Sequence, residues 1–95
     1  MFVSLTTSTI QGDRLAKAEE FLRSFLPRMR RLPGVVAIYH YARPGKGDAT
    51  TVVIWESEQA LKDYRSGELV KEAIAFEKEL QLASTREAYP LSHAL

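Results

Sequence analysis

Cysteine is absent from this 95-residue chain. Disulfides, thiolate nucleophiles and thiolate metal sites are therefore excluded, and the composition suits a reducing compartment. No apolar run approaches the ~20 residues that span a bilayer. The N-terminal MFVSLTTSTI lacks the basic region and cleavage site of a signal peptide. The net charge of +1 is too small to select nucleic acid or an acidic membrane. We expect a cytoplasmic protein with neither partner.

The chain does contain enough apolar material to fold. Hydrophobic residues make up 45% of it and charged residues 26%, which is typical of a soluble globule and argues against disorder. The length suits one domain over residues 1–95. A domain this short hides only roughly 60–65% of its unfolded surface, so association with a second copy is a natural way to bury more.

The first third of the chain predicts a strand followed by a helix. Residues 2–10 are rich in β-branched side chains and predict a strand. From Asp13, a plausible helix cap, apolar residues recur at helical spacing. The stripe consists of Leu15, Ala18, Leu22, Phe25, Met29 and Leu32. Pro27 cannot donate to the carbonyl of Arg23, so we expect a kink or a restart there. The sequence LPG at 32–34 ends the helix.

The rest of the chain predicts a hairpin, a broken helix and a last strand. Strands over 35–43 and 49–56 flank the turn PGKGD at 44–48. Ser57 can cap a helix that starts at Glu58. RSG at 65–67 interrupts this helix. The next helix carries an apolar stripe of Leu69, Ala73, Phe76 and Leu80, flanked by Val70 and Ile74. The stretch 83–89 before Pro90 is a modest last strand.

The order of elements is β-α-β-β-α-β, the ferredoxin-like α+β arrangement, with an antiparallel sheet and its helices on one face. The predicted strands 35–43 and 49–56 are apolar on both faces. On the first, Val36 and Ile38 are expected to point one way and Val35, Ala37, Tyr39 and Tyr41 the other. Helices cover only one face, so we predict a homodimer whose two sheets face each other around a shared core.

LPGVVAIYHY, followed by TVVIWESEQALKDYRSGELVKEAIAFEKEL, resembles the antibiotic biosynthesis monooxygenase family of the dimeric α/β-barrel superfamily. The resemblance covers nearly the whole chain and implies a dimeric α/β barrel. It is less specific for chemistry, because the superfamily includes oxygenases, haem-degrading enzymes, isomerases and ligand-binding regulators. In this family the aromatic residue at the Trp55 position generally faces a cavity between sheet and helices. Trp55 is then a pocket wall, and its alternative is a plain core residue.

The haem-degrading branch of this superfamily pairs such a Trp with an Asn on the first strand and an axial His on the last helix. The His position falls on Ile74, which cannot ligate iron. The first strand contains no Asn. The resemblance therefore argues against haem degradation. We assign Trp55, Ile74 and Phe76 to the substrate pocket instead.

The quinol-oxidising branch demands less of the protein, because its enzymes use no metal or flavin. This resemblance implies a cofactor-independent monooxygenase acting on a small apolar aromatic or polyketide-like compound. Tyr64, on the inward helix face, can hydrogen-bond a substrate oxygen, and the neutral imidazole of His40 can accept a phenolic proton. Both are candidate catalytic residues. The alternatives are a core tyrosine and a histidine at the rim or on the dimer face.

Other motifs carry weaker signals. RMRR at 28–31 fits a solvated helix end better than a nucleic-acid site. PGKGD lacks the spacing of a phosphate loop, and His93 lies in a tail. No carboxylate pair has metal-ligand spacing, so we expect no metal. The resemblance to the quinol-oxidising branch implies that no cofactor is needed. The competing hypothesis is a non-enzymatic small-molecule-binding or structural homodimer, and an isomerase or lyase on the same scaffold stays open.

Overall fold

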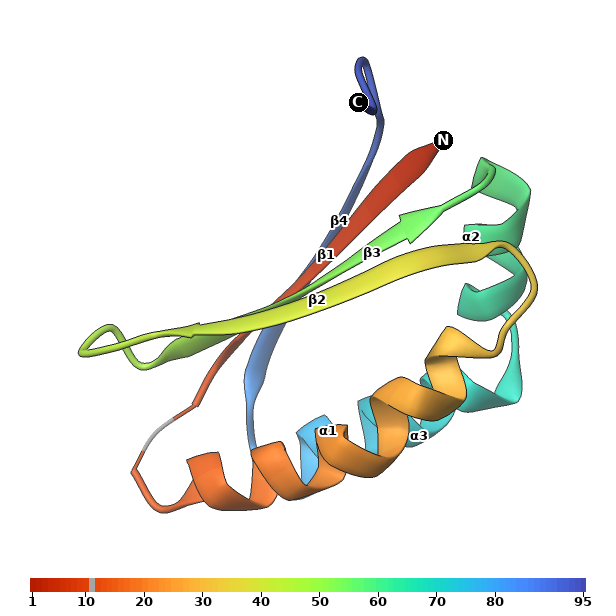
Figure 1. Cartoon of the computed structure of the whole chain (residues 1–95). Helices are drawn as coiled ribbons and strands as arrows, with labels where there is room; N and C mark the ends of the chain where they lie inside the picture. Colours follow the sequence, from red (N-terminus) through yellow and green to blue (C-terminus); the bar gives the residue numbers. More distant parts are fainter. Residues whose placement is uncertain (11) are drawn as a thin grey trace.

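The computed structural model describes residues 1–10 and 12–95. In this part of the chain a four-stranded antiparallel sheet, in the order β2-β3-β1-β4, packs against three helices. The elements are β1 (Phe2–Thr9), α1 (Arg14–Arg30), β2 (Val35–Arg43), β3 (Asp48–Trp55), α2 (Glu58–Arg65), α3 (Glu68–Glu79) and β4 (Ala83–Pro90). The helices lie on one face of the sheet (Figure 1). This confirms the predicted ferredoxin-like fold and the division of its second helix into two pieces.

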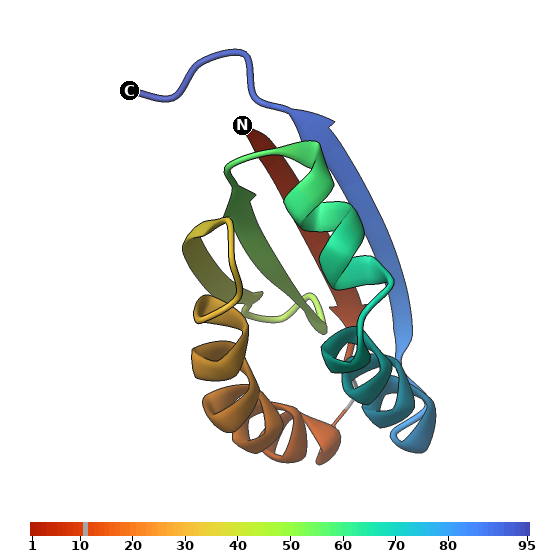
Figure 2. The same cartoon turned by 90° about the vertical axis from the view of Figure 1, so that its right-hand side faces the viewer.

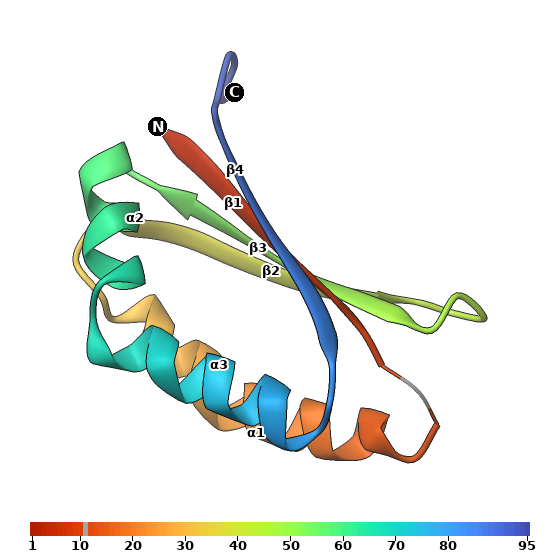
Figure 3. The same ribbon diagram turned by 180° about the vertical axis from the view of Figure 1, so that it is seen from behind.

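The helices divide the covered face between them. Viewed from one end, α1 lies on the β2 side of the sheet, whereas α2 and α3 lie on the β4 side (Figure 2). Within the described residues, no helix covers the opposite face (Figure 3).

None of the helices described has the length and apolar character that crossing a lipid bilayer requires.

The ends of the helices follow local chemistry, with two corrections to the sequence predictions. Ser57 caps α2 as predicted, because its Oγ accepts a hydrogen bond from the backbone N–H of Ala60 at 3.2 Å. Asp13 occupies the N-cap position of α1, but its side chain makes no capping hydrogen bond. Of the two outcomes predicted at Pro27, a kink or a restart, the restart is wrong, since α1 continues through this residue. Phe25 and Met29 are both buried, so core packing on either side of Pro27 offsets the one missing hydrogen bond.

A β-bulge in β2 corrects the predicted faces of that strand. Val35 pairs with Trp55 and Ala37 pairs with Ile54, so one extra residue lies between these pairs. The extra residue shifts the in-and-out alternation by one position. Val35 is therefore buried in the core under the helices, and Val36 is 40% exposed.

The core forms two clusters of buried residues between the sheet and the helices. The larger cluster contains Phe25, Met29, Val35, Val53, Trp55, Leu61 and Ala73. The smaller cluster contains Ile10, Ala18 and Ala49. Members of both clusters line one cavity, so the fold leaves a space where the two clusters meet.

Gly34, directly before β2, lies so close to α2 that we expect its replacement to destabilise the fold. A Cβ added at Gly34 lies 2.5 Å from the Cβ of Ala60, and the φ of Gly34 is +85°. Gly45 has a similar φ of +75° but open space around it. We expect Gly45→Ala to cost about 1 kcal/mol through backbone strain alone. Gly34→Ala adds a steric clash and should cost more than about 2 kcal/mol. Urea unfolding of both variants measures the difference, and equal losses would contradict the clash.

Candidate functional site

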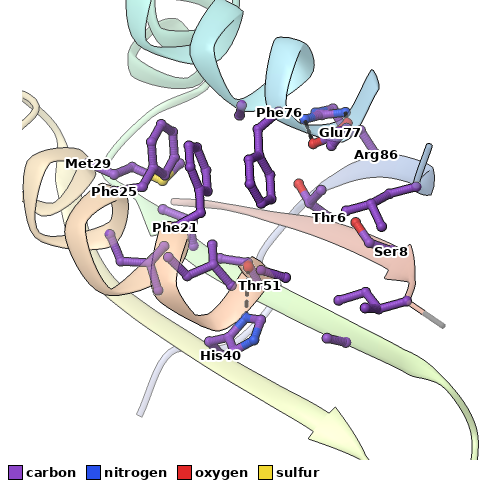
Figure 4. Close-up of a pocket in the computed structure, with 18 of the residues that line it drawn as sticks. Thr6, Ser8, Phe21, Phe25, Met29, His40, Thr51, Phe76, Glu77 and Arg86 are labelled. Carbon is purple, nitrogen blue, oxygen red and sulfur yellow. Dashed lines mark hydrogen bonds and ion pairs between the residues drawn. The ribbon is translucent and has the colours of Figure 1, made fainter. Parts of the chain in front are cut away.

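A cavity of about 70 Å³ lies between the sheet and helices α1 and α3. Its helical side is mostly apolar, with Tyr64 and Glu77 as the polar members, whereas several polar side chains line it from the sheet (Figure 4). The apolar lining from the helices consists of Ala18, Phe21, Leu22, Phe25, Leu26, Met29, Ala73 and Phe76. The polar lining from the strands consists of Thr6, Ser8, His40, Thr51 and Arg86. This division gives the cavity an apolar roof and a polar floor.

Stacked phenylalanines form the roof. The ring of Phe21 on α1 stacks on Phe76 of α3, with centroids 4.1 Å apart and planes 8° from parallel. Phe21 also stacks on Phe25 at 5.0 Å. Each such pair contributes about 0.5–1.5 kcal/mol beyond burial of its area. The stack joins α1 to α3 and presents flat apolar surfaces suited to contact with a planar ring.

The floor owes its polarity to the alternation of β1. Ser4, Thr6 and Ser8 share one face of this strand, and that face lies under the helices. Two of these hydroxyls have partners in the protein. Ser4 accepts from the indole N–H of Trp55 at 2.9 Å, and the Oγ atoms of Ser8 and Ser84 are 2.7 Å apart. These bonds offset the cost of placing hydroxyls beside a core.

His40 lies on the floor, on the face of the sheet that the helices cover. Its Nδ1 is 3.0 Å from the Oγ1 of Thr51, its direct partner on β3. The structure therefore settles the orientation that the sequence left open, since His40 lines the cavity and not the uncovered face. The bond to Thr51 fixes the ring through one nitrogen and leaves Nε2 as the other functional atom.

A charged pair closes one side of the cavity. Arg86 of β4 binds Glu77 of α3 through two parallel hydrogen bonds, Nη1 to Oε1 at 2.9 Å and Nη2 to Oε2 at 2.5 Å. The side chains are only 27% and 15% exposed. The hydrogen bond that Arg86 donates to Glu77 raises the pKa of Arg86 above its usual value. In the ranges 1–10 and 12–95, no three His, Asp or Glu side chains cluster as metal ligands would.

Tyr64 of α2 contributes a neutral hydroxyl to the same space. Burial raises its pKa to about 12, with opposing effects from the charges of Arg86 and Glu77. Its ring lies 5.5 Å from that of Trp55 and also lines the cavity. At neutral pH the phenol keeps its proton, so it acts as a hydrogen-bond donor or acceptor and not as an anion.

Three of the five predicted site residues meet in this cavity. His40, Tyr64 and Phe76 line it, whereas Trp55 and Ile74 do not. Trp55 is 0% exposed and belongs to the core. Trp55 therefore takes the second of the two positions that the sequence left open, a core residue, and Tyr64, which lies against the indole, lines the cavity.

Ile74 points away because of helical geometry. Ala73, Phe76 and Glu77 are spaced to share one face of α3, and all three line the cavity. The next residue after Ala73 is rotated by about 100°, and Ile74 is 37% exposed.

The sequence predictions missed the polar floor and the Glu77–Arg86 pair. One signal was available, because Ser4, Thr6 and Ser8 place three hydroxyls in succession on one face of a central strand, where Phe2 is the apolar residue. A charged residue at an inward position of β4 was not readable, since the modest last strand gave no indication of its inward face.

The raised pKa of Tyr64 predicts how stability changes at high pH. The unfolded phenol ionises near pH 10 and the folded one near pH 12, so the folded state holds its proton longer. Stability from this group is fully present below pH 10 and is lost as pH rises towards 12. Between pH 9 and 11 the free energy of unfolding should fall more in the parent protein than in Tyr64→Phe, by on the order of 1 kcal/mol. Urea unfolding at each pH measures this, and parallel profiles would refute it.

The model of the antibiotic biosynthesis monooxygenase family matches residues 1–75. The fold is similar to that of a candidate antibiotic biosynthesis monooxygenase from Deinococcus radiodurans, with a TM-score of 0.91, 18% identity, and coverage of 100% of this chain and 96% of that one. It is also similar to SnoaB, a cofactor-independent oxygenase from Streptomyces nogalater, with a TM-score of 0.81, 17% identity, and coverage of 99% and 95%.

Rv0793 from Mycobacterium tuberculosis has a TM-score of 0.78 and 19% identity, with full coverage of both chains. No curated protein matches the sequence at a significant level. Identities this low establish the common fold and not a common substrate. The family model spans residues 1–75 of the 95, so this protein belongs to the antibiotic biosynthesis monooxygenase family.

Proposed function

We propose that this protein is a cofactor-independent monooxygenase acting on a small, electron-rich aromatic compound. The cavity under the helices carries the proposal, because it combines stacked phenyl rings with hydroxyl, imidazole and charged groups. Family membership supports oxygenation as the reaction class. The similarity to SnoaB, a cofactor-independent oxygenase, supports chemistry in which the substrate itself reacts with oxygen.

The size of the cavity favours a small substrate. Its volume of about 70 Å³ is below the roughly 150 Å³ of an apolar cavity known to hold benzene. Entry of even a single ring therefore requires lining side chains to move. Met29 and Leu26 of α1 are flexible aliphatic members of the roof that can do so without disturbing the sheet.

The proposed reaction needs no external reductant. A deprotonated phenol or enol donates an electron to dioxygen, and the resulting pair combines at a substrate carbon. The substrate loses two hydrogen atoms and gains one oxygen atom, while the second oxygen atom leaves as water. The protein has to position the substrate, exclude water and stabilise the anion.

The lining residues suit these tasks. Thr51 lies 3.0 Å from Nδ1 of His40, and in the tautomer whose Nδ1–H donates to Thr51, Nε2 is left to accept the substrate proton. The neutral phenol of Tyr64 can donate to a developing oxyanion. Arg86 uses two of its N–H groups for Glu77 and keeps others for the same anion. Because the pair has no net charge, its contribution is directional hydrogen bonding.

Oxygen uptake with a panel of substrates tests the proposal. The panel runs from single-ring hydroquinones to three-ring anthrones, and we expect uptake above buffer for at least one compound. His40→Ala should then lower the rate about 10²-fold or more, as removal of a general base does. Tyr64→Phe should lower it about tenfold, as loss of one hydrogen bond to a charged oxygen does.

Tyr41→Phe is a matched control, because Tyr41 is 49% exposed and does not line the cavity. It should leave the rate unchanged. Uptake no greater than in buffer for every compound would overturn oxygenation. Ligand binding without any uptake would instead support the alternative of a non-enzymatic binding protein.

We also propose that two copies associate through the uncovered face of the sheet. Cross-strand pairing brings apolar residues together on this face, and the helices do not shield them. The patch consists of Val3, Leu5, Ala37, Tyr39, Val52, Ile54 and Tyr89. Tyr39 is 63% exposed. A contiguous apolar surface of this kind indicates a binding interface, and a second copy of the same sheet is complementary to it in apolar character.

Light scattering after gel filtration tests this association. We expect a mass of twice the 10.7 kDa protomer, and Val52→Glu should yield the protomer because a charge at the centre of the patch cannot be buried without a partner. Ala16→Glu on the exposed side of α1 is the control and should stay dimeric. A parent protein that elutes as a folded protomer would rule out the dimer.

A further inference from the structure

Four polar side chains form a single row across the width of the sheet. His40 pairs with Thr51, Thr51 pairs with Thr6, and Thr6 pairs with Arg86. All four line the cavity. Adjacent strands are about 4.8 Å apart, so the row is roughly 14 Å long. Figure 4 shows Thr6 between Thr51 and the Glu77–Arg86 pair.

Thr6 differs from the other members of this row in its hydrogen bonding. Thr51 is hydrogen-bonded to His40, and Arg86 to Glu77. Across residues 1–10 and 12–95, no protein group hydrogen-bonds to the hydroxyl of Thr6. In the same residues every fully buried side-chain nitrogen or oxygen has a partner. The hydroxyl of Thr6 is therefore not sealed in the core, and it is reached from the cavity that Thr6 lines.

The neighbours of Thr6 on its own strand sharpen the contrast. Ser4 and Ser8 face the same way, and both hydroxyls are satisfied within the protein, by Trp55 and Ser84. Thr6 stands between them at the centre of the floor, below the phenylalanine stack. A hydroxyl beside apolar walls costs free energy unless something bonds to it.

We propose that Thr6 is the residue that determines where a ligand oxygen sits, with the ligand ring held under the phenylalanine roof. A hydroxyl or carbonyl oxygen of the ligand, placed above Thr6, completes the row. It then lies between Thr51 on one neighbouring strand and Arg86 on the other. Thr6 selects oxygen-bearing rings over bare hydrocarbons, because a threonine hydroxyl both donates and accepts. This inference rests on the proposed cavity as the ligand site, and it deepens the proposal by naming the group that the ligand must carry.

A pair of probes that differ by one oxygen tests this assignment. The dissociation constants of phenol and benzene are measured by NMR titration without oxygen, so turnover plays no part. In Thr6→Val, which keeps the shape and removes the hydroxyl, the ratio of the benzene to the phenol constant should fall about fivefold, as loss of one hydrogen bond predicts.

Two further variants keep the test specific. Thr6→Ser retains a hydroxyl and should keep the ratio of the parent protein. Thr9→Val removes a hydroxyl from an exposed position on the same strand and should also leave the ratio unchanged. An unchanged ratio in Thr6→Val, as expected if only water lies above Thr6, would overturn the inference, as would a parent protein that binds neither probe. The binding ratio tests only the role of Thr6, whereas oxygen uptake tests the proposed function. Failure of this inference is therefore distinguishable from failure of the proposed function.

Discussion

The register of β1 against its two neighbours decides which side chains meet in the interior. β1 lies at the centre of the sheet and pairs along its whole length with β3 on one side and β4 on the other. This pairing sets Ser4 within reach of the indole of Trp55 and brings Thr6 between Thr51 and Arg86. A slip by one residue would turn Ser4, Thr6 and Ser8 to the uncovered face and bring Val3, Leu5 and Thr7 under the helices. The polar floor, and with it any chemistry in the cavity, depends on that register.

The roof depends on a different contact. Phe21 and Phe76 stack between two helices that are far apart in sequence, and Arg28 joins the same helices on the surface by binding Glu72. Exposed ion pairs contribute little, so the aromatic stack is the stronger link. A site with a rigid polar floor and a roof of side chains that can shift is suited to a ligand that enters from the helical side, since the sheet can hold its geometry while the roof adapts.

Sequence patterns predicted the local structure well where one chemical signal dominates. Ser57 caps α2 and the break at 65–67 divides the second helix, because capping and glycine act within a few residues. Predictions failed where packing overrides a local preference. Pro27 lies inside a continuous helix, and the bulge that reverses Val35 is invisible to strict alternation. Trp55 met a similar limit, since its spacing is compatible with either a pocket wall or the core, and only its complete burial in the core cluster distinguishes them.

The sequence by itself determined the order of elements, the family resemblance and the apolar character of both faces of β2 and β3, because these depend on periodicity and on short-range signals. Only the tertiary structure decided that His40 faces the cavity, that Arg86 meets Glu77, and that Thr6 has no hydrogen-bond partner among residues 1–10 and 12–95. Each of these depends on strand register or on how a helix is rotated against the sheet. Those quantities are set by the packing of the whole chain, so no single segment carries them.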